Sequence, residues 1–101
     1  MNMINTIKKM LGIKSVDFAL LMAQGAKVID VRTPGEFASG HVRGAVNIPL
    51  DQIGKKATTL KKNETYILCC RSGMRSASAT QQLKSMGFTS VFNAGSWQRL
   101  Q

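Results

Sequence analysis

The chain has 101 residues, of which 44% are apolar, and this composition suits one compact domain that buries a core without covalent cross-links. Its formal net charge is +9, from 14 basic and 5 acidic residues, so we expect its partners to be anionic. The basic residues occur in short pairs such as Lys55 and Lys56, and no nucleic-acid-binding motif is present. We therefore expect a small anionic substrate and no nucleic acid.

The two cysteines, Cys69 and Cys70, are adjacent and cannot close a useful loop by pairing, which excludes a disulfide framework. Free cysteines are typical of a reducing compartment, so we predict a cytoplasmic location. No segment reaches the roughly 20 apolar residues that a transmembrane helix needs, and the N-terminus lacks the pattern of a secretory signal. We therefore expect no transmembrane segment.

Residues 1–13 are predicted to form an amphipathic helical extension that precedes a domain over residues 14–101. Apolar side chains recur in the extension at helical spacing, with Lys8 and Lys9 on the opposite face. Helices of this kind commonly pack on their own domain, but contact with a membrane surface or with a partner stays open.

The rest of the chain alternates between short apolar runs and helical patterns. Strands are predicted for residues 27–31, 45–48, 65–69 and 89–92. Helices are predicted for SVDFALLMAQ with Ser15 as its N-cap, and for residues 34–40, 50–60 and 75–86. The last helix has four side chains available for burial: Ala77, Ala79, Leu83 and Met86. The alternation predicts an α/β fold with a parallel sheet that is covered on both faces.

Cys70 directly follows the predicted strand 65–69, and ligands of parallel sheets bind beyond the carboxyl ends of the strands. The loop from Cys70 to Arg75 then opens a helix, whose first N–H groups and dipole attract an anion. Arg71 and Arg75 add two permanent cations, and Gly73 lets the loop turn tightly. These features favour a thiolate, the nucleophilic form of cysteine, although a strand-end cysteine can also be an inert buried thiol.

Two blocks of sequence, VIDVRTPGEFASGHVRGAVNIPL and CCRSGMRSA, strongly resemble the rhodanese family, and the resemblance covers about residues 15–97. It implies a three-layer α/β/α fold with a parallel five-stranded sheet. It also implies that Cys70 is the catalytic nucleophile, which takes up sulfane sulfur as a persulfide. The loop that binds the substrate would then consist of Arg71, Ser72, Gly73, Met74 and Arg75.

Loop length separates two chemistries in this family. Six residues counted from the cysteine suit sulfur transfer, and one residue more suits relatives that act on phosphate or arsenate. Cys70 to Arg75 is six residues, so the resemblance implies a sulfurtransferase and disfavours a phosphatase or an arsenate reductase. The basic loop resembles members that accept thiosulfate. The implied reaction moves sulfur from thiosulfate or a persulfide to a thiophilic acceptor through a Cys70 persulfide.

Four further residues lie in or near the predicted site. Asp30 and Arg32 end the strand IDVR and should approach the same end of the sheet as Cys70. We predict that Arg32 is held in a polar network under the loop and that Asp30 orients it, the alternative being a structural ion pair. Cys69 should point into the core, away from Cys70. His41 stands alone, so we expect a local hydrogen bond there, with no metal and no cofactor.

The C-terminal segment leaves two functions open. Ala94 replaces one glycine of the family's usual paired-glycine turn, Trp97 comes earlier than usual, and the chain ends at Gln101. A pocket left open in this way would suit a protein partner as well as a small molecule. The alternatives are therefore an enzyme that turns over small donors, and a sulfur carrier or protein-interaction module with little turnover of its own.

Overall fold

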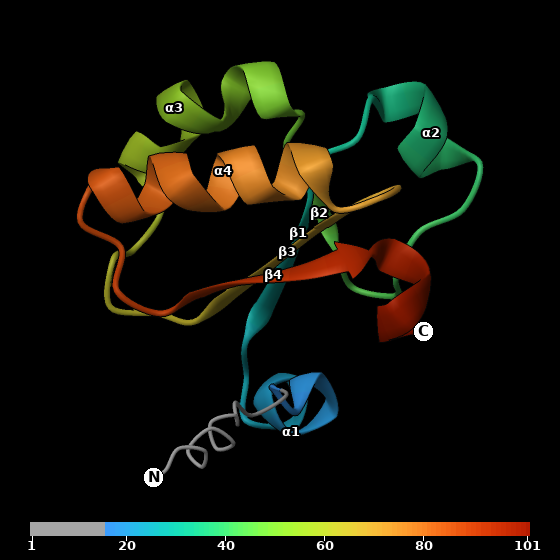
Figure 1. The fold of residues 1–101 in the computed structure, drawn as a ribbon, viewed down its shortest axis with the longest axis horizontal. Helices are drawn as coiled ribbons and strands as arrows, with labels where there is room; N and C mark the ends of the chain where they lie inside the picture. The colour runs from blue at the N-terminus through green and yellow to red at the C-terminus, as the bar shows by residue number, and fades with distance from the viewer. Residues whose placement is uncertain (1–15) are drawn as a thin grey trace, which may run out of the picture.

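Four parallel strands form the centre of the computed structural model, which describes residues 16–101 (Figure 1). They are β1 (Lys27–Asp30), β2 (Val46–Asn47), β3 (Tyr66–Cys70) and β4 (Val91–Ser96). Their order across the sheet is β2-β1-β3-β4, so β1 and β3 are the inner strands. The helical extension predicted for residues 1–13 lies outside the described residues.

The predicted α/β class with a parallel sheet is confirmed, but over residues 16–101 the sheet has four strands where the family resemblance implied five. All four coincide with apolar runs of the sequence, although their ends differ. Cys70 is the last residue of β3 instead of the first loop residue, because it pairs with Ser96. β4 extends to Ser96 because a bulge at Ala94 lets it keep pairing with the end of β3.

The helices are α1 (Phe18–Ala23), α2 (Pro34–Ala38), α3 (Ile53–Lys56) and α4 (Met74–Ser85). Short 3₁₀ helices complete the fold: η1 (Leu50–Gln52), η2 (Ala57–Thr59) and η3 (Trp97–Leu100). Helix α1 is capped by Asp17 and not by Ser15 as predicted, since the Asp17 carboxylate accepts from the N–H of Leu20 at 3.0 Å. Helix α2 begins at Pro34 as predicted, behind a capping box of Thr33 and Glu36.

The prediction of one continuous helix over residues 50–60 was wrong, because η1, α3 and η2 follow one another there. Gly54 lowers the helix propensity in the middle of the segment. Near its end the Thr58 hydroxyl donates to the carbonyl oxygen of Lys55 at 2.8 Å. Such local bonds compete with the regular α-helical pattern and favour short, tight turns.

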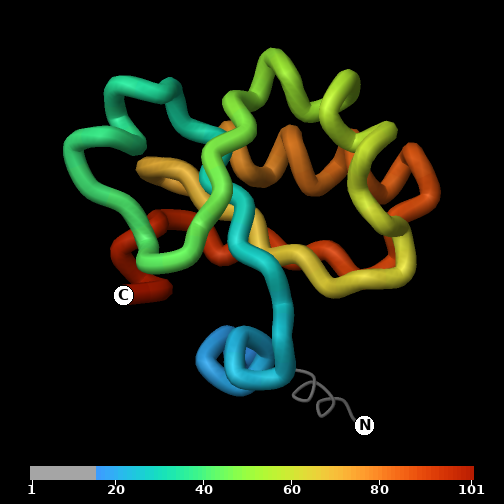
Figure 2. Tube along the Cα trace, turned by 180° about the vertical axis from the view of Figure 1, so that it is seen from behind, coloured from blue at the N-terminus to red at the C-terminus, as the bar shows by residue number. Residues whose placement is uncertain are grey.

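Helices cover both faces of the sheet, as Figures 1 and 2 show from opposite sides, and this confirms the three-layer arrangement. On one face α3 and α4 cover a core that includes Ile29, Leu68, Ile53 and Leu83. On the other face α1 and η3 cover a smaller core that includes Val28, Ile67, Cys69 and Leu100. Cys70 belongs to the first core and Cys69 to the second, so the prediction that their side chains diverge is confirmed.

Helix α4 starts just beyond the end of β3 and buries one face against the sheet. The buried side chains are Ser76, Ala79, Thr80 and Leu83. Ala77, which we expected to be buried, is exposed, because the buried stripe begins at Ser76 and continues at spacings of three and four residues. A polar residue, Ser76, is therefore brought to the end of β3. Within residues 16–101, no helix is long and apolar enough to cross a membrane.

Candidate functional site

The Cys70 thiol lies at the carboxyl end of β3, under the loop that leads into α4. Its Sγ accepts hydrogen bonds from the N–H of Gly73 at 3.0 Å and from the hydroxyl of Ser76 at 3.4 Å. Cys70 has no exposed surface, because the loop closes over it.

Gly73 at the tip of this loop has a conformation that other residues rarely adopt. Its φ is +103°, and a Cβ at this position would lie 3.2 Å from the Cα of Gly95 in β4. The loop tip thus packs backbone to backbone against β4. Glycine is required here both for the turn and for this close approach, and the turn aims the Gly73 N–H at the sulfur.

Opposing effects set the pKa of Cys70. Burial raises the pKa, but hydrogen bonds from the Ser76 hydroxyl and from the backbone N–H groups of Ser76, Gly73 and Ser72 outweigh it and lower the pKa from its ordinary value of 9.0. Cys69 has no such donors, and burial raises its pKa to about 12. The two cysteines thus shift in opposite directions, and the reactivity of Cys70 stays a prediction.

Asn93 on β4 is a residue of the site that sequence reasoning missed. Its side-chain oxygen accepts from the Ser76 hydroxyl at 2.6 Å and from the N–H of Gly95 at 2.9 Å. Its amide nitrogen donates to the carbonyl oxygen of Gly73 at 3.2 Å. Asn93 therefore ties the loop, the start of α4 and the bulge of β4 together. Sequence reasoning missed Asn93 because the predicted strand 89–92 ended one residue before it, whereas β4 continues to Ser96.

Arg75 extends across to α2 and forms an ion pair. Its guanidinium donates to both carboxylate oxygens of Glu36, at 2.7 and 3.1 Å. Hydrogen bonds from Arg75, and then from the Thr33 backbone, lower the pKa of Glu36 to about 2. The positive charge that we expected Arg75 to add beside the thiol is thus compensated in this structure.

The other loop residues predicted to bind substrate are open to solvent. Arg71 and Ser72 are exposed, and Met74 is 80% exposed. Arg71 makes no ion pair or side-chain hydrogen bond with another residue in the described part of the chain. No carboxylate in the described part of the chain therefore neutralises the charge of Arg71, and this charge is available to an incoming anion.

Asp30 and Arg32 form a buried ion pair next to this end of the sheet. The Arg32 guanidinium donates to both Asp30 oxygens at 2.7–3.0 Å and to the carbonyl oxygen of Gly40 at 2.7 Å. The bonds to Asp30 raise the pKa of Arg32 against the opposing effect of burial. Trp97 covers the pair, with its ring 4.6 Å from the guanidinium carbon. The network is present as predicted, and its catalytic role stays a prediction.

His41 lies outside this network. Its ring stacks on Phe37 with 3.7 Å between ring centroids, and its Nδ1 lies 2.7 Å from the Phe37 carbonyl oxygen. The predicted local hydrogen bond is confirmed. Among residues 16–101, no three histidine, cysteine or carboxylate side chains gather as metal ligands. The absence of a metal or cofactor stays a prediction.

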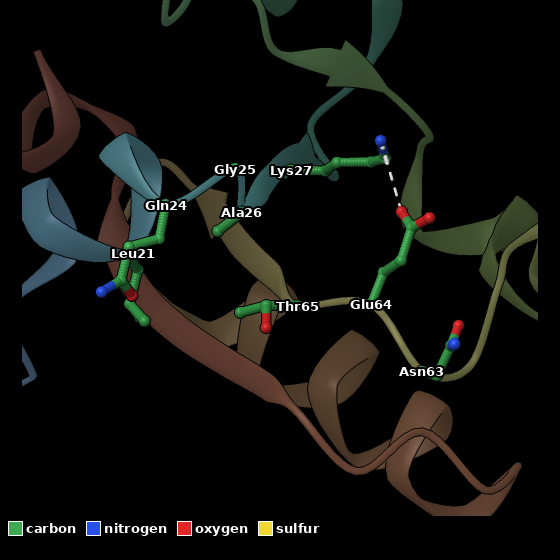
Figure 3. Close-up of a pocket in the computed structure, with 8 residues that line it drawn as sticks. All are labelled: Leu21, Gln24, Gly25, Ala26, Lys27, Asn63, Glu64 and Thr65. Atoms are coloured by element: carbon green, nitrogen blue, oxygen red, sulfur yellow. Dashed lines mark ion pairs between the residues drawn. The ribbon is translucent and has the colours of Figure 1, made fainter.

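A pocket of about 370 Å³ opens beside the loop, between α2 and η3. It is lined by Arg32, Glu36, Ser39, Arg71, Trp97 and Gln98. Another pocket, of about 400 Å³, lies where α1 meets the starts of β1 and β3 (Figure 3). There Lys27 and Glu64 neutralise each other at 3.3 Å, and no cysteine, serine or histidine lines the wall. The candidate chemistry therefore lies at the Cys70 end.

A strand-end cysteine under a loop of N–H donors that opens a helix is the geometry the sequence resemblance implied. Residues 15–100 match the family described as "Rhodanese-like domain". The chain belongs to the rhodanese-like family. Relatives in this family are named a thiosulfate sulfurtransferase and a putative sulfur carrier.

Three comparisons illustrate this rhodanese-like membership. The chain is 39% identical over 80 residues to "Thiosulfate sulfurtransferase PspE" of Escherichia coli, covering 77% of each protein. It is 36% identical over 70 residues to "Putative sulfur carrier protein YrkF" of Bacillus subtilis, covering 69% of this chain and 38% of YrkF. A solved Escherichia coli rhodanese with anions has 39% identity and a TM-score of 0.69, over 73% of this chain and 89% of that one.

The match covers only part of several relatives. In Bacillus subtilis, it spans 54% of the protein YqhL, 38% of YrkF and 62% of YtwF.

Proposed function

We propose that this protein is a sulfurtransferase that carries sulfane sulfur on Cys70. In the first step the Cys70 thiolate attacks the outer sulfur of thiosulfate. A bond forms between Sγ and that sulfur, the sulfur–sulfur bond of the donor breaks, and sulfite leaves with the electron pair. In the second step a thiophilic acceptor attacks the outer sulfur of the persulfide, and Cys70 leaves as a thiolate. A persulfide donor would react in the same way.

The observation that carries this proposal is the set of N–H donors around Sγ. Gly73 donates at 3.0 Å, and with the donors from Ser72 and Ser76 it lowers the pKa of Cys70 although the thiol is buried. The same donors would hold the negative outer sulfur of a persulfide after transfer, as an oxyanion hole holds developing charge. Arg71 would attract the anionic donor to the loop. We propose Asp30 and Arg32 as the pair that supports this end of the sheet.

A second candidate function is a sulfur carrier or interaction module that receives sulfur from a protein and turns over little. Two observations favour it: the relative YrkF is named a putative sulfur carrier, and Met74 is 80% exposed at the loop. An exposed methionine beside the nucleophile offers an adaptable apolar contact for a protein donor or acceptor. Both functions use the same Cys70 persulfide and differ in turnover.

The remaining assignments follow from the same reasoning. We propose a cytoplasmic location, since both cysteines are free thiols that persist in a reducing compartment. The partners we propose are a small anionic sulfur donor and, for the carrier function, a protein acceptor, without nucleic acid. We retain residues 14–101 as the domain and residues 1–13 as its helical extension.

The test measures sulfur loading and turnover separately. Wild type, Cys70→Ser and Cys69→Ser are incubated with thiosulfate or glutathione persulfide, and the intact masses are measured for a gain of about 32 Da, one sulfur atom. Cyanolysis assays on the same samples give turnover. We expect loading and thiocyanate formation in wild type and Cys69→Ser and neither in Cys70→Ser.

Each outcome separates the hypotheses. Loading with negligible turnover would favour the carrier over the enzyme. Loading of Cys70→Ser to the wild-type level would refute the assignment of Cys70. If wild type neither takes up sulfur nor forms thiocyanate with either donor, the sulfur-transfer proposal is wrong.

A further inference from the structure

The pocket between α2 and η3 has one uncompensated charge. Three charged side chains line it: Arg32, Glu36 and Arg71. Arg32 is neutralised by Asp30 at 2.7 Å, and Glu36 by Arg75 at 2.7 Å. Arg71 has no carboxylate partner in the described part of the chain. The pocket therefore presents one net positive charge, at the residue that directly follows Cys70.

The pocket is also larger than a simple inorganic donor requires. Its volume of about 370 Å³ compares with about 30 Å³ for a water molecule in the liquid, so it has room for an organic chain several atoms long. Pockets that bind small organic molecules start at about 300 Å³. Thiosulfate would occupy only the part nearest the loop.

One wall of the pocket is rigid and aromatic. The Trp97 ring packs against the Arg32 guanidinium at 4.6 Å, and a Cβ on Gly40 would lie 3.3 Å from a ring carbon. The ring is thus held from two sides and offers an apolar surface to methylene groups. Ser39 and Gln98 add polar groups at the rim, and both are exposed.

We propose that this pocket is the acceptor subsite for small organic thiols that carry a carboxylate, and that Arg71 binds the carboxylate while the carbon chain lies along Trp97. The inference rests on the sulfur transfer proposed above and specifies its second step. The acceptor thiolate attacks the outer sulfur of the Cys70 persulfide, forming a new sulfur–sulfur bond. The bond from that sulfur to Sγ breaks with its electron pair on Sγ. The products are an organic persulfide and the Cys70 thiolate, so no oxidant or reductant is needed.

Gln98 allows a test that leaves the loop untouched. Its side chain is exposed, lines the pocket, and makes no hydrogen bond within residues 16–101, so changing it to lysine or glutamate should preserve the fold. Gln81 is an exposed glutamine on α4 outside the pocket and provides matched controls. The variants are therefore Gln98→Lys, Gln98→Glu, Gln81→Lys and Gln81→Glu.

The experiment follows the acceptor step alone. Each protein is loaded with thiosulfate, freed of donor and mixed at low salt with 3-mercaptopropionate or with its neutral amide, 3-mercaptopropionamide. The loss of the added sulfur from Cys70 is followed by mass spectrometry. Both thiols react as thiolates, and only the acid carries a second negative charge. We therefore expect Gln98→Lys to raise, and Gln98→Glu to lower, the ratio of the 3-mercaptopropionate rate to the amide rate by about threefold each. The Gln81 variants should match wild type with both thiols.

Several results would overturn the subsite. They are equal changes for the acid and the amide, no change for either thiol, and shifts in the Gln81 variants as large as those in the Gln98 variants. The last would mean that the overall charge of the protein steers the thiol. If wild-type Cys70 takes up no sulfur in the loading step, the failure belongs to the proposed sulfur transfer and is seen before any acceptor is added.

Discussion

Replacing Ser76 by alanine tests how the fold activates the Cys70 thiol. Ser76 is fully buried, and its hydroxyl lies 3.4 Å from the Cys70 Sγ. A hydrogen bond to a charged group contributes about 1.5–3 kcal/mol. The hydroxyl has one proton, however, and the Asn93 oxygen at 2.6 Å and the Gly73 carbonyl at 3.2 Å compete for it. We therefore expect the lower end of that range.

A loss of about 1.4 kcal/mol corresponds to a rise of about one unit in the pKa of Cys70. The pKa should not rise further, because the N–H groups of Ser72, Gly73 and residue 76 stay in place in the Ser76→Ala protein. The fold should lose no more than about 1 kcal/mol, the net contribution of one hydrogen bond, since Asn93 keeps the N–H of Gly95 as a donor.

The assay is the rate of alkylation by iodoacetamide as a function of pH, read by mass spectrometry. Cys69 should not interfere, because burial raises its pKa to about 12 and leaves it protonated over the range of the assay. Ser78→Ala is the matched control, since Ser78 is exposed on the same helix. If Ser76→Ala and Ser78→Ala both titrate like wild type, the hydroxyl contributes nothing and the backbone N–H groups alone activate Cys70.

Other changes probe the ion pairs and the loop. The ion pair with Arg75 lowers the pKa of Glu36 from 4.5 to about 2. It therefore stabilises the fold fully above about pH 4.5, and this stabilisation is lost as the pH falls to about 2. The advantage of wild type over Glu36→Gln in urea midpoints should shrink across that range. Asp30→Asn leaves the Arg32 charge buried without its partner and should cost about 3–5 kcal/mol in denaturant unfolding. Gly73→Ala places a side chain at φ +103° and should cost about 1–2 kcal/mol and raise the thiol pKa in the alkylation assay.

Each of these three substitutions has an outcome that would contradict its structural basis. If the urea midpoints of wild type and Glu36→Gln fall in parallel as the pH is lowered, the ion pair is absent in solution. Asp51→Asn, at an exposed site, should change stability by less than about 0.5 kcal/mol, and an equally small change for Asp30→Asn would contradict the buried pair. Gly35 has an ordinary φ and open space around it, so Gly35→Ala should be tolerated. A Gly73→Ala protein as stable as Gly35→Ala would contradict the loop geometry.

The inner strands β1 and β3 could be predicted from sequence because they are buried on both faces, which leaves short apolar runs between turn residues. The same reasoning placed Cys70 directly after the predicted strand 65–69 and in front of a helix, one residue from its observed place as the last residue of β3. It failed for residues 50–60, where a helical spacing of apolar residues coincides with Gly54 and with hydroxyls that bond locally. There the pattern predicts which side chains are buried but not how the backbone is arranged.

The contacts around the thiol were harder to predict because they join distant segments. Asn93 lies on the same face of β4 as Val91, and it meets Ser76 because β4 continues past the predicted strand 89–92. Glu36 and Arg75 are 39 residues apart, and it is the position of α2 at the carboxyl end of the sheet that joins them. Neither contact follows from composition or spacing.

Cys69 and Cys70 show what the fold adds to a cysteine. They are neighbours in one strand, both are fully buried, and composition does not distinguish them. Burial alone would raise the pKa of each, as it does for Cys69. Cys70 differs because its side chain faces the start of α4, where Gly73 and Ser76 direct their donors at the sulfur. The lowered pKa of Cys70 therefore comes from the side of the strand on which the loop folds, and the raised pKa of Cys69 from the side without donors.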